Sequence, residues 1–210
     1  MIRLLVADCH DVVRAGLRKI LESHAKFEVV AEASNGRDAV SKALQTKPDV
    51  AILDYALPLM NGAEVTRQIH TRLPRTEVLI FTMYGDENII HDILFAGARG
   101  YLLKTDAMAD LLTAIESLAL HKPFFTATIA QALLDTFLNH PGHAQSVITA
   151  RERNVLQLIA EGHTSKQIAG VLNVSVKTVE SHRAALKRKL KLSSSASLVR
   201  YAIRNKIAQA

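Results

Sequence analysis

Short apolar runs that each end at a polar residue are the feature that most constrains the fold of this chain. Four such runs lead to Asp8, Asp54, Thr82 and Lys104. Apolar runs of this length, alternating with helical-period segments, are typical of buried parallel strands joined by crossover helices. Ligands bind at the carboxyl ends of the strands in such sheets. We therefore expect the four polar side chains to converge on one edge of a sheet.

Two carboxylates, a hydroxyl and an ammonium form a set suited to holding a divalent cation beside a phosphoryl group. Each residue taken alone has a simpler interpretation, because polar residues at strand ends often form turns. Four of them in register across the first half of the chain favour a shared site.

The order of the apolar patterns predicts five β/α units. The expected strands cover residues 2–7, 27–33, 49–53, 77–81 and 100–103. Apolar residues at three- and four-residue spacing predict helices over residues 12–21, 39–44, 65–69, 89–96 and 111–120. A β-then-α order repeated five times predicts an α/β fold with a doubly wound, five-stranded parallel sheet.

Charge divides the chain into two unequal parts. Residues 147–210 contain 12 Lys+Arg against 3 Asp+Glu, a balance of +9, whereas the remainder contains 14 against 17, a balance of −3. A mildly acidic part joined to a small, strongly basic part suggests a regulatory module attached to a nucleic-acid binder. The alternative is an ordinary solvated basic surface.

Composition favours a globular protein of one large or two modest domains. Hydrophobic residues make up 49% of the chain and charged residues 22%, and no apolar run approaches the roughly 18 residues needed to cross a bilayer. The first residues lack the layout of a signal peptide, and the chain has one cysteine. We expect a cytoplasmic protein with no disulfide and no membrane partner.

A linker is expected at residues 121–145, because the β/α pattern stops there. It contains a predicted helix at about residues 127–138, and proline and glycine break the chain again at 139–143. Its three histidines lack the spacing of metal ligands, so a solvated hinge is the favoured interpretation. The expected domains are therefore 1–120 and 146–210.

The second domain is predicted to be all helical. Four short helices are expected at residues 150–161, 165–172, 176–191 and 196–205. Their ends carry local signals: two capping boxes and two residues that stop helices. These are Thr149 with Glu152, Thr164 with Gln167, Gly162 and Asn173.

The predicted helix at 176–191 has two chemically different faces. Val176, Val179, Leu186 and Leu190 form an apolar stripe, and the opposite face is small, polar and basic. Small residues allow close approach to base edges, and lysine and arginine reach phosphates, so this face suits the major groove of DNA. With the tight turn before it, the pattern predicts a helix-turn-helix. The expected DNA contacts are Thr164, Ser165, Lys166, Lys177, Thr178, Glu180, Ser181, Lys187 and Arg188.

The motifs taken together resemble a known family. The first half carries LLVAD at 4–8, LDYALP at 53–58, NG at 61–62, FT at 81–82 and GARGYLLK at 97–104. The second half carries TARER at 149–153, SKQIA at 165–169 and VSVKTVESHR at 174–183. These stretches resemble a flavodoxin-like receiver domain followed by a LuxR-type helix-turn-helix domain, as in the NarL/FixJ family of two-component response regulators.

The resemblance implies that Asp54 accepts a phosphoryl group from a sensor histidine kinase. Lys104 would pair with the phosphoryl charge, and Thr82 would hydrogen-bond one of its oxygens. In the family, the residue at the position of Thr82 moves together with an aromatic residue, here Tyr101, to couple phosphorylation to a change of surface.

The metal site departs from the family pattern. Asp8, Asp54 and the backbone carbonyl of Ala56 would hold Mg²⁺, but Cys9 stands where the family usually carries a second acid. A thiol is soft and neutral near pH 7, so we expect weakened Mg²⁺ binding and slower phosphorylation. Asp11 is expected to begin the first helix rather than replace the missing acid. A redox role for Cys9 is disfavoured, because nearby carboxylates raise its pKa.

We expect a DNA-binding response regulator whose phosphorylation controls dimerisation and promoter binding, acting with RNA polymerase on transcription. Its active form is expected to be a homodimer on paired half-sites of double-stranded DNA. An apolar strip on the last helix is the candidate dimer contact, although such a strip would equally close the helical core. It consists of Leu198, Val199, Ala202 and Ile203.

Two alternatives remain. Because of Cys9, the receiver would act as a phosphorylation-independent interaction module on a DNA-binding regulator, although the retained Asp54, Thr82 and Lys104 favour a working switch. A phosphate-handling enzyme is disfavoured, because no glycine-rich phosphate loop follows the first strand. We expect the protein not to be an enzyme.

Overall fold

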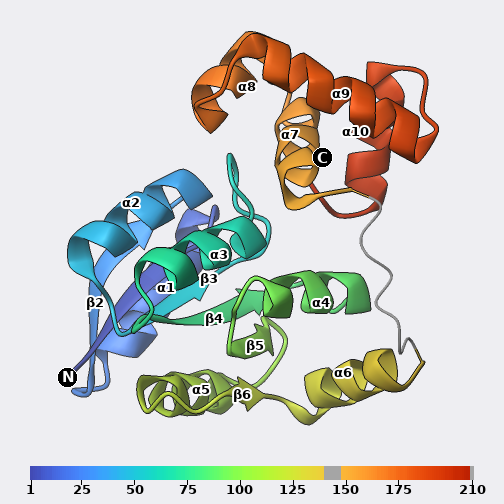
Figure 1. The fold of residues 1–210 in the computed structure, drawn as a ribbon. Coiled ribbons are helices and arrows are strands. Elements are labelled where there is room, and N and C mark those ends of the chain that lie inside the picture. Colours follow the sequence, from blue (N-terminus) through green and yellow to red (C-terminus); the bar gives the residue numbers. More distant parts are fainter. Residues whose placement is uncertain (140–147, 209–210) are drawn as a thin grey trace. The chain divides into compact units, whose positions relative to one another are not determined.

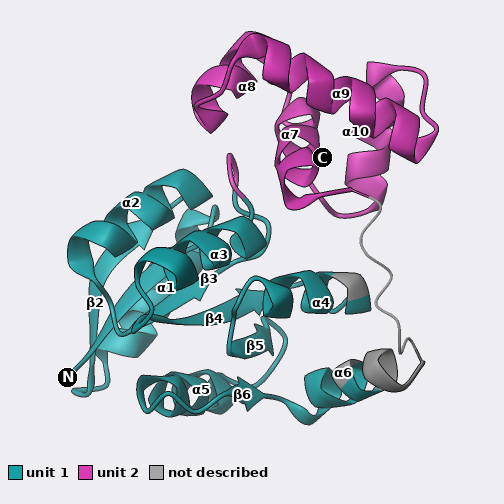
Figure 2. Cartoon of the chain, viewed as in Figure 1, with its two compact units in different colours: residues 1–57, 61–141 teal, residues 58–60, 142–210 magenta. Residues whose placement is uncertain are grey.

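The computed structural model describes residues 1–139 and 148–208, which form two compact units (Figures 1 and 2). One unit comprises residues 1–57 and 61–141, and the other comprises residues 58–60 and 142–210. Each unit has its own hydrophobic core.

A parallel sheet in the order β2-β1-β3-β4-β5-β6 forms the centre of the first unit (Figure 1). This is the predicted doubly wound α/β fold, and all strands pair in parallel because helices connect them. The strands are β1 (Ile2–Ala7), β2 (Phe27–Ala33), β3 (Val50–Leu53), β4 (Glu77–Thr82), β5 (Gly100–Leu103) and β6 (Phe124–Phe125).

The sixth strand corrects the predicted count of five. β6 pairs with β5 through Gly100 opposite Phe124 and Tyr101 opposite Phe125. Two residues are too few to show a strand period, so the pairing depends on the open edge of β5. The segment after residue 120, predicted as linker, thus adds a strand to the sheet.

The helices of the first unit lie on both faces of the sheet. Side chains of α1 and α5 share one core with alternate strand residues such as Leu4, Ile52 and Leu79. On the other face, α2 contacts α3 and α3 contacts α4. The bounds are α1 Asp11–Glu22, α2 Gly36–Thr46, α3 Gly62–Arg72, α4 Glu87–Phe95 and α5 Met108–Ala119.

The helix expected in the linker is present as α6 (Ala127–Asn139) and lies beside α4. Asn139, the first residue of the predicted break, ends α6. Residues 140–143 of that break, with two of the three linker histidines, lie outside the described residues.

The second unit contains the four predicted helices, which are α7 (Ala150–Ala160), α8 (Ser165–Leu172), α9 (Val176–Leu190) and α10 (Ser195–Arg204). Both predicted capping boxes are formed, at Thr149 with Glu152 and at Thr164 with Gln167. Asn173 ends α8 in the left-handed conformation, with φ 52°. These local signals place α8 and α9 around a tight turn, as a helix-turn-helix requires.

In the described part of the chain, no helix is both long enough and apolar enough to cross a membrane.

Candidate functional site

The strand order places a candidate site at the carboxyl edge of the sheet. β1 lies between β2 and β3, so the chain winds in opposite directions on either side of it. Such a switch point leaves a crevice outside the strand ends, where ligands bind. Asp8 directly follows β1 and Asp54 directly follows β3, and their exposed fractions are 2% and 4%.

All four polar residues predicted to converge are in direct contact. Lys104 Nζ donates a hydrogen bond to Asp54 Oδ2 at 2.7 Å and a second one to Asp8 Oδ2. Thr82, the last residue of β4, donates from Oγ1 to Asp54 Oδ1 at 2.7 Å. Asp54 therefore lies at the centre of the cluster, with an ammonium on one oxygen and a hydroxyl on the other.

The cluster keeps its lysine charged. Burial lowers the pKa of the Lys104 ammonium, but the combined effect of Asp54 and Asp8 is greater and raises the pKa above its ordinary value. Since two carboxylates face one ammonium, the cluster has a net negative charge and attracts a further cation.

Gly62 fixes the loop that carries Asp54. Its N–H donates to the carbonyl of Tyr55 at 2.8 Å, and α3 begins at this residue. A Cβ at position 62 would lie 2.6 Å from the carbonyl oxygen of Asp54, closer than atoms approach. Only glycine therefore lets α3 start this close to the end of β3.

Ala56 is placed near Asp54 through its backbone, as the N–H of Ala56 lies 3.4 Å from Asp54 Oδ1. Its expected role as a carbonyl ligand of a metal ion stays a prediction.

Tyr101 links β5 to the loop after β4. Its ring is buried, and its hydroxyl donates to the backbone carbonyl of Tyr84 at 2.6 Å. Burial, with a smaller effect of Tyr55, raises the pKa of this hydroxyl and keeps it protonated as a donor. Tyr84 follows Thr82 by two residues, so Tyr101 contacts the segment that continues from Thr82.

Cys9 and His10 lie beside Asp8 at the start of the next loop. Burial and then the charges of Asp8 and Asp54 raise the pKa of the Cys9 thiol, in line with the effect expected from the sequence. His10 Nδ1 lies 3.0 Å from Asp8 Oδ1, a contact that the sequence analysis missed. Asp11 begins α1 as predicted and pairs with Arg14, with its side chain 88% exposed. It makes no contact with the cluster in the described structure.

The donor set partly suits Mg²⁺. The carboxylates of Asp8 and Asp54 are hard oxygen ligands on one buried edge, whereas Cys9 adds a neutral sulfur. Asp8 and Asp54 are therefore the two side chains that would hold Mg²⁺ here.

The second unit presents a polar face along α9. Lys177, Glu180, Ser181 and Arg188 are exposed on it, and Ser175 caps the helix by accepting from the N–H of Thr178. Leu186 and Val179 are fully buried on the opposite side, as predicted. All nine predicted DNA contacts are exposed or half-buried: Thr164, Ser165, Lys166, Lys177, Thr178, Glu180, Ser181, Lys187 and Arg188.

Val176 is a correction to the predicted apolar stripe, because it is 45% exposed. It is the first residue of α9 and lies before the turn that reaches the core. Val176 therefore lies outside the buried part of the stripe.

Arg183 connects part of this surface through contacts that the sequence pattern does not predict. Its guanidinium donates to Ser195 Oγ at 3.0 Å and to Ser165 Oγ at 3.4 Å. Ser165 in turn donates to the carboxylate of Glu180. Ser165 and Glu180, expected as separate contacts, are thus joined across α8 and α9.

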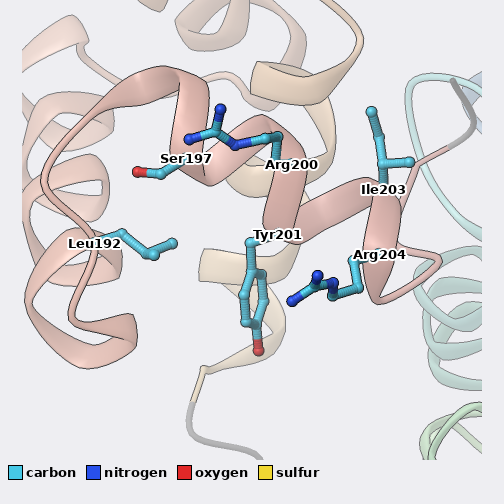
Figure 3. A pocket seen from close by; sticks show the side chains of 6 residues that line it. All are labelled: Leu192, Ser197, Arg200, Tyr201, Ile203 and Arg204. Carbon is cyan, nitrogen blue, oxygen red and sulfur yellow. The ribbon is translucent and has the colours of Figure 1, made fainter.

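The apolar strip predicted on the last helix is divided between two surroundings. Leu198 and Ala202 are fully buried in the core of the second unit, so they close that core. Val199 is half-buried and Ile203 is 39% exposed. Ile203 borders a surface hollow of about 460 Å³ with two arginines of the same helix (Figure 3). The residues around it are Leu192, Ser197, Arg200, Tyr201, Ile203 and Arg204.

A doubly wound sheet with this acidic cluster, joined to a helix-turn-helix unit, defines a two-component transcription regulator rather than an enzyme. Residues 4–116 match the family model "Response regulator receiver domain", and residues 146–202 match "Bacterial regulatory proteins, luxR family". The chain belongs to the NarL/FixJ family of response regulators, with a receiver domain and a LuxR-type DNA-binding domain.

Individual relatives agree with this assignment. The chain is 38% identical over 214 residues to the oxygen regulatory protein NreC of Staphylococcus haemolyticus, covering 98% of each chain. It is similar to the RcsB response regulator of Salmonella typhimurium, with a TM-score of 0.60, 27% identity, and coverage of 95% and 97% of the two chains. An RcsB–DNA complex matches with a TM-score of 0.60, 26% identity, and coverage of 95% and 96%.

Proposed function

We propose that a sensor histidine kinase phosphorylates Asp54 and that this modification controls DNA binding by the second domain. The observation that carries the proposal is the contact set of Asp54, whose two oxygens accept from Lys104 and Thr82 at 2.7 Å each. An incoming phosphoryl group places new oxygens beside these donors, so both contacts can transfer from the carboxylate to the phosphoryl group.

Asp8 and Asp54 would hold Mg²⁺ in this proposal, and the bound ion would supply positive charge that favours the transfer. Lys104 contacts the opposite side of the phosphoryl group, and the Thr82 hydroxyl moves to donate a hydrogen bond to one phosphoryl oxygen. Because Tyr101 holds the carbonyl of Tyr84, displacement of Thr82 is transmitted along the β4–α4 loop to α4. The chemical event is small, and the response is a changed protein surface.

Cys9 makes the Mg²⁺ site weaker than a site with three acids, and phosphorylation correspondingly slower. The proposal predicts that Cys9→Asp increases both the Mg²⁺ affinity and the rate of phosphoryl transfer. Both are measured by following phosphorylation in a titration with Mg²⁺. Cys9→Ser is the control, because it keeps a neutral side chain at the same position. Equal Mg²⁺ affinity in the Asp and Ser variants would contradict this role of Cys9.

The partner of the second domain is promoter DNA, contacted by the polar face of α9 and the start of α8. Support comes from the exposed basic residues of that face and from the RcsB–DNA complex, whose chain aligns over nearly the full length. We propose that the active form is a homodimer on paired half-sites, recruits RNA polymerase, and works in the cytoplasm, where both DNA and kinase domains are found. Val199 and Ile203 on α10 are the remaining candidates for dimer contact.

The decisive experiment incubates the full chain with a small-molecule phosphodonor, with and without Mg²⁺, and follows intact mass. One phosphoryl group per chain is expected, and Asp54→Asn abolishes it. Asp49→Asn is the matched control, because Asp49 lies at the opposite end of β3. The same samples are titrated with promoter fragments by fluorescence anisotropy.

Phosphorylation should tighten DNA binding in the unmodified sequence and leave the Asp54→Asn variant unchanged. No mass gain at any Mg²⁺ concentration, with DNA binding intact, would instead favour a phosphorylation-independent regulator whose receiver is an interaction module.

A further inference from the structure

Three different metal-binding groups follow β1 on consecutive residues. Asp8, Cys9 and His10 each offer one donor atom, and these atoms all lie within 4.8 Å of one another. Among the side chains that the structure describes, no other three such groups converge so closely. Sulfur and imidazole nitrogen are donors that ions of the Zn²⁺ class prefer and that Mg²⁺ does not.

Two of the three distances between the donor atoms are close to those of tetrahedral coordination, and the third is at most 4.8 Å. His10 Nδ1 lies 3.0 Å from Asp8 Oδ1 and 3.4 Å from Cys9 Sγ. Usual zinc–ligand bond lengths place a nitrogen and an oxygen ligand about 3.4 Å apart, and a nitrogen and a sulfur ligand about 3.6 Å apart. Only small side-chain movements are therefore needed to receive an ion.

Asp8 divides its two carboxylate oxygens between two neighbours. Oδ2 accepts from Lys104 within the Asp54 cluster, whereas Oδ1 accepts from the backbone N–H of His10 at 2.8 Å and faces its ring. An ion bound at Asp8 Oδ1 leaves the hydrogen bond from Lys104 to Oδ2 in place. The ion and the Lys104 ammonium are then attracted by the same carboxylate charge. The His10 side chain is 56% exposed, so the ion can approach from solvent.

We propose that Asp8, Cys9 and His10 bind a thiophilic divalent cation of the Zn²⁺ class, with water completing the coordination. On binding, the Cys9 S–H bond breaks, a sulfur–metal bond forms, and the proton leaves to solvent, so no oxidant or reductant is required. The occupied site competes with Mg²⁺ for Asp8 and slows phosphorylation of Asp54. Only this competition rests on the proposed function; the metal site itself does not.

Cobalt titration of the full, tag-free chain tests the site without a phosphodonor. Because Cys9 is the one cysteine of the sequence, a thiolate-to-cobalt charge-transfer band reports on this residue alone. The expected band saturates at one Co²⁺ per chain, is displaced by Zn²⁺, and is absent in Cys9→Ser. His10→Gln should weaken Co²⁺ binding by at least about tenfold, and the control His24→Gln should not.

A missing band, a band unaffected by His10→Gln, or saturation at one Co²⁺ per two chains would overturn the site. The competition is tested separately, by phosphodonor assays in Mg²⁺ with increasing Zn²⁺. Phosphorylation is expected to slow in the unmodified chain and to stay constant in Cys9→Ser. A rate that is unchanged by Zn²⁺ overturns the competition, and absence of phosphorylation before Zn²⁺ is added overturns the proposed function instead.

Discussion

The receiver cluster and the polar face of α9 both depend on charged side chains, but they hold them in opposite surroundings. Asp8 and Asp54 are almost fully buried and share Lys104, which reaches them from the end of another strand. Lys177 and Arg188 instead lie exposed along one helix. A buried charge must be paired because its desolvation is costly, whereas an exposed charge is stabilised by water. We therefore expect strong, coupled responses to change in the receiver and small, additive responses on α9.

The largest effect is expected from Lys104→Met, which leaves two buried carboxylates without their cation. Loss of a buried partner costs about 3 kcal/mol of unfolding free energy, whereas Lys42→Met should cost less than about 1 kcal/mol, because Lys42 and its partner Asp38 are partly exposed. Denaturant unfolding of both variants near pH 7 measures this difference. Equal losses would remove the proposed contrast between buried and exposed charges.

The unmodified chain and the Lys104→Met variant also test how the stabilising effect of Lys104 depends on pH. The folded-state pKa of Lys104 is raised above 10.5, so its stabilising effect is complete below that pH and is lost as pH rises through the folded-state pKa. As pH rises from 7, the stability gap between the unmodified chain and Lys104→Met should therefore narrow only under strongly alkaline conditions. A gap that closes between pH 7 and pH 10.5 would show that Lys104 is not held charged by the two acids.

Gly62→Ala changes the backbone that supports the buried site and leaves its charges in place. The new Cβ would meet the carbonyl of Asp54 at 2.6 Å, so we expect a loss of about 1–3 kcal/mol and slower phosphorylation. Gly16→Ala is the matched control on α1, where nothing lies within 4 Å, and it should stabilise by about 0.5–1 kcal/mol. Thermal unfolding that ranks the two variants in reverse would exclude this role of Gly62.

A smaller effect is expected from Glu152→Gln in the second domain. Burial raises the pKa of Glu152, but Lys189 at 2.7 Å and the N–H of Thr149 outweigh it, so the pKa lies below its ordinary 4.5. Glutamine keeps the capping box and loses the ion pair, at a cost of about 1 kcal/mol. Because the folded-state pKa is lowered, this difference is present above pH 4.5 and disappears as pH falls through the folded-state pKa. A difference in unfolding free energy between Glu152→Gln and the unmodified chain that persists in acid would indicate lost packing rather than a lost ion pair.

The smallest effect concerns the exposed charges of α9. Lys177→Ala and Arg188→Ala should each reduce the salt dependence of DNA binding by about one unit of the log–log slope, with additive effects in the double variant. Lys19→Ala on α1 is the control and should leave the slope unchanged. Strong non-additivity in anisotropy titrations would show that the face is coupled like the receiver cluster.

Additive effects are not expected for the α8 and α9 residues that contact Arg183. Ser165 and Glu180 are joined through one hydrogen bond and share Arg183, so variants at these positions should couple while Lys177 and Arg188 do not. A double-mutant cycle between Ser165→Ala and Glu180→Gln measures this coupling in DNA affinity.

Several features of the molecule follow from local sequence alone. The apolar runs and their polar ends predicted the strands, and the parallel order then required Asp8, Asp54, Thr82 and Lys104 to meet at one edge, as they do. The capping residues Thr149 and Thr164 predicted where α7 and α8 begin, because caps act through neighbouring backbone groups. Such signals depend on residues within one turn or one strand, so the sequence contains them in full.

Tertiary structure decided the features that depend on residues distant in the chain. β6 exists because the edge of β5 accepts two residues, and Leu198 and Ala202 are buried because α7 packs against α10. The division of the Asp8 oxygens between Lys104 and His10, and the network of Arg183, are equally invisible in a linear pattern. Periodicity shows which side of an element is apolar, but only packing determines which neighbour covers it, since burial and hydrogen-bond partners arise when separate elements come together.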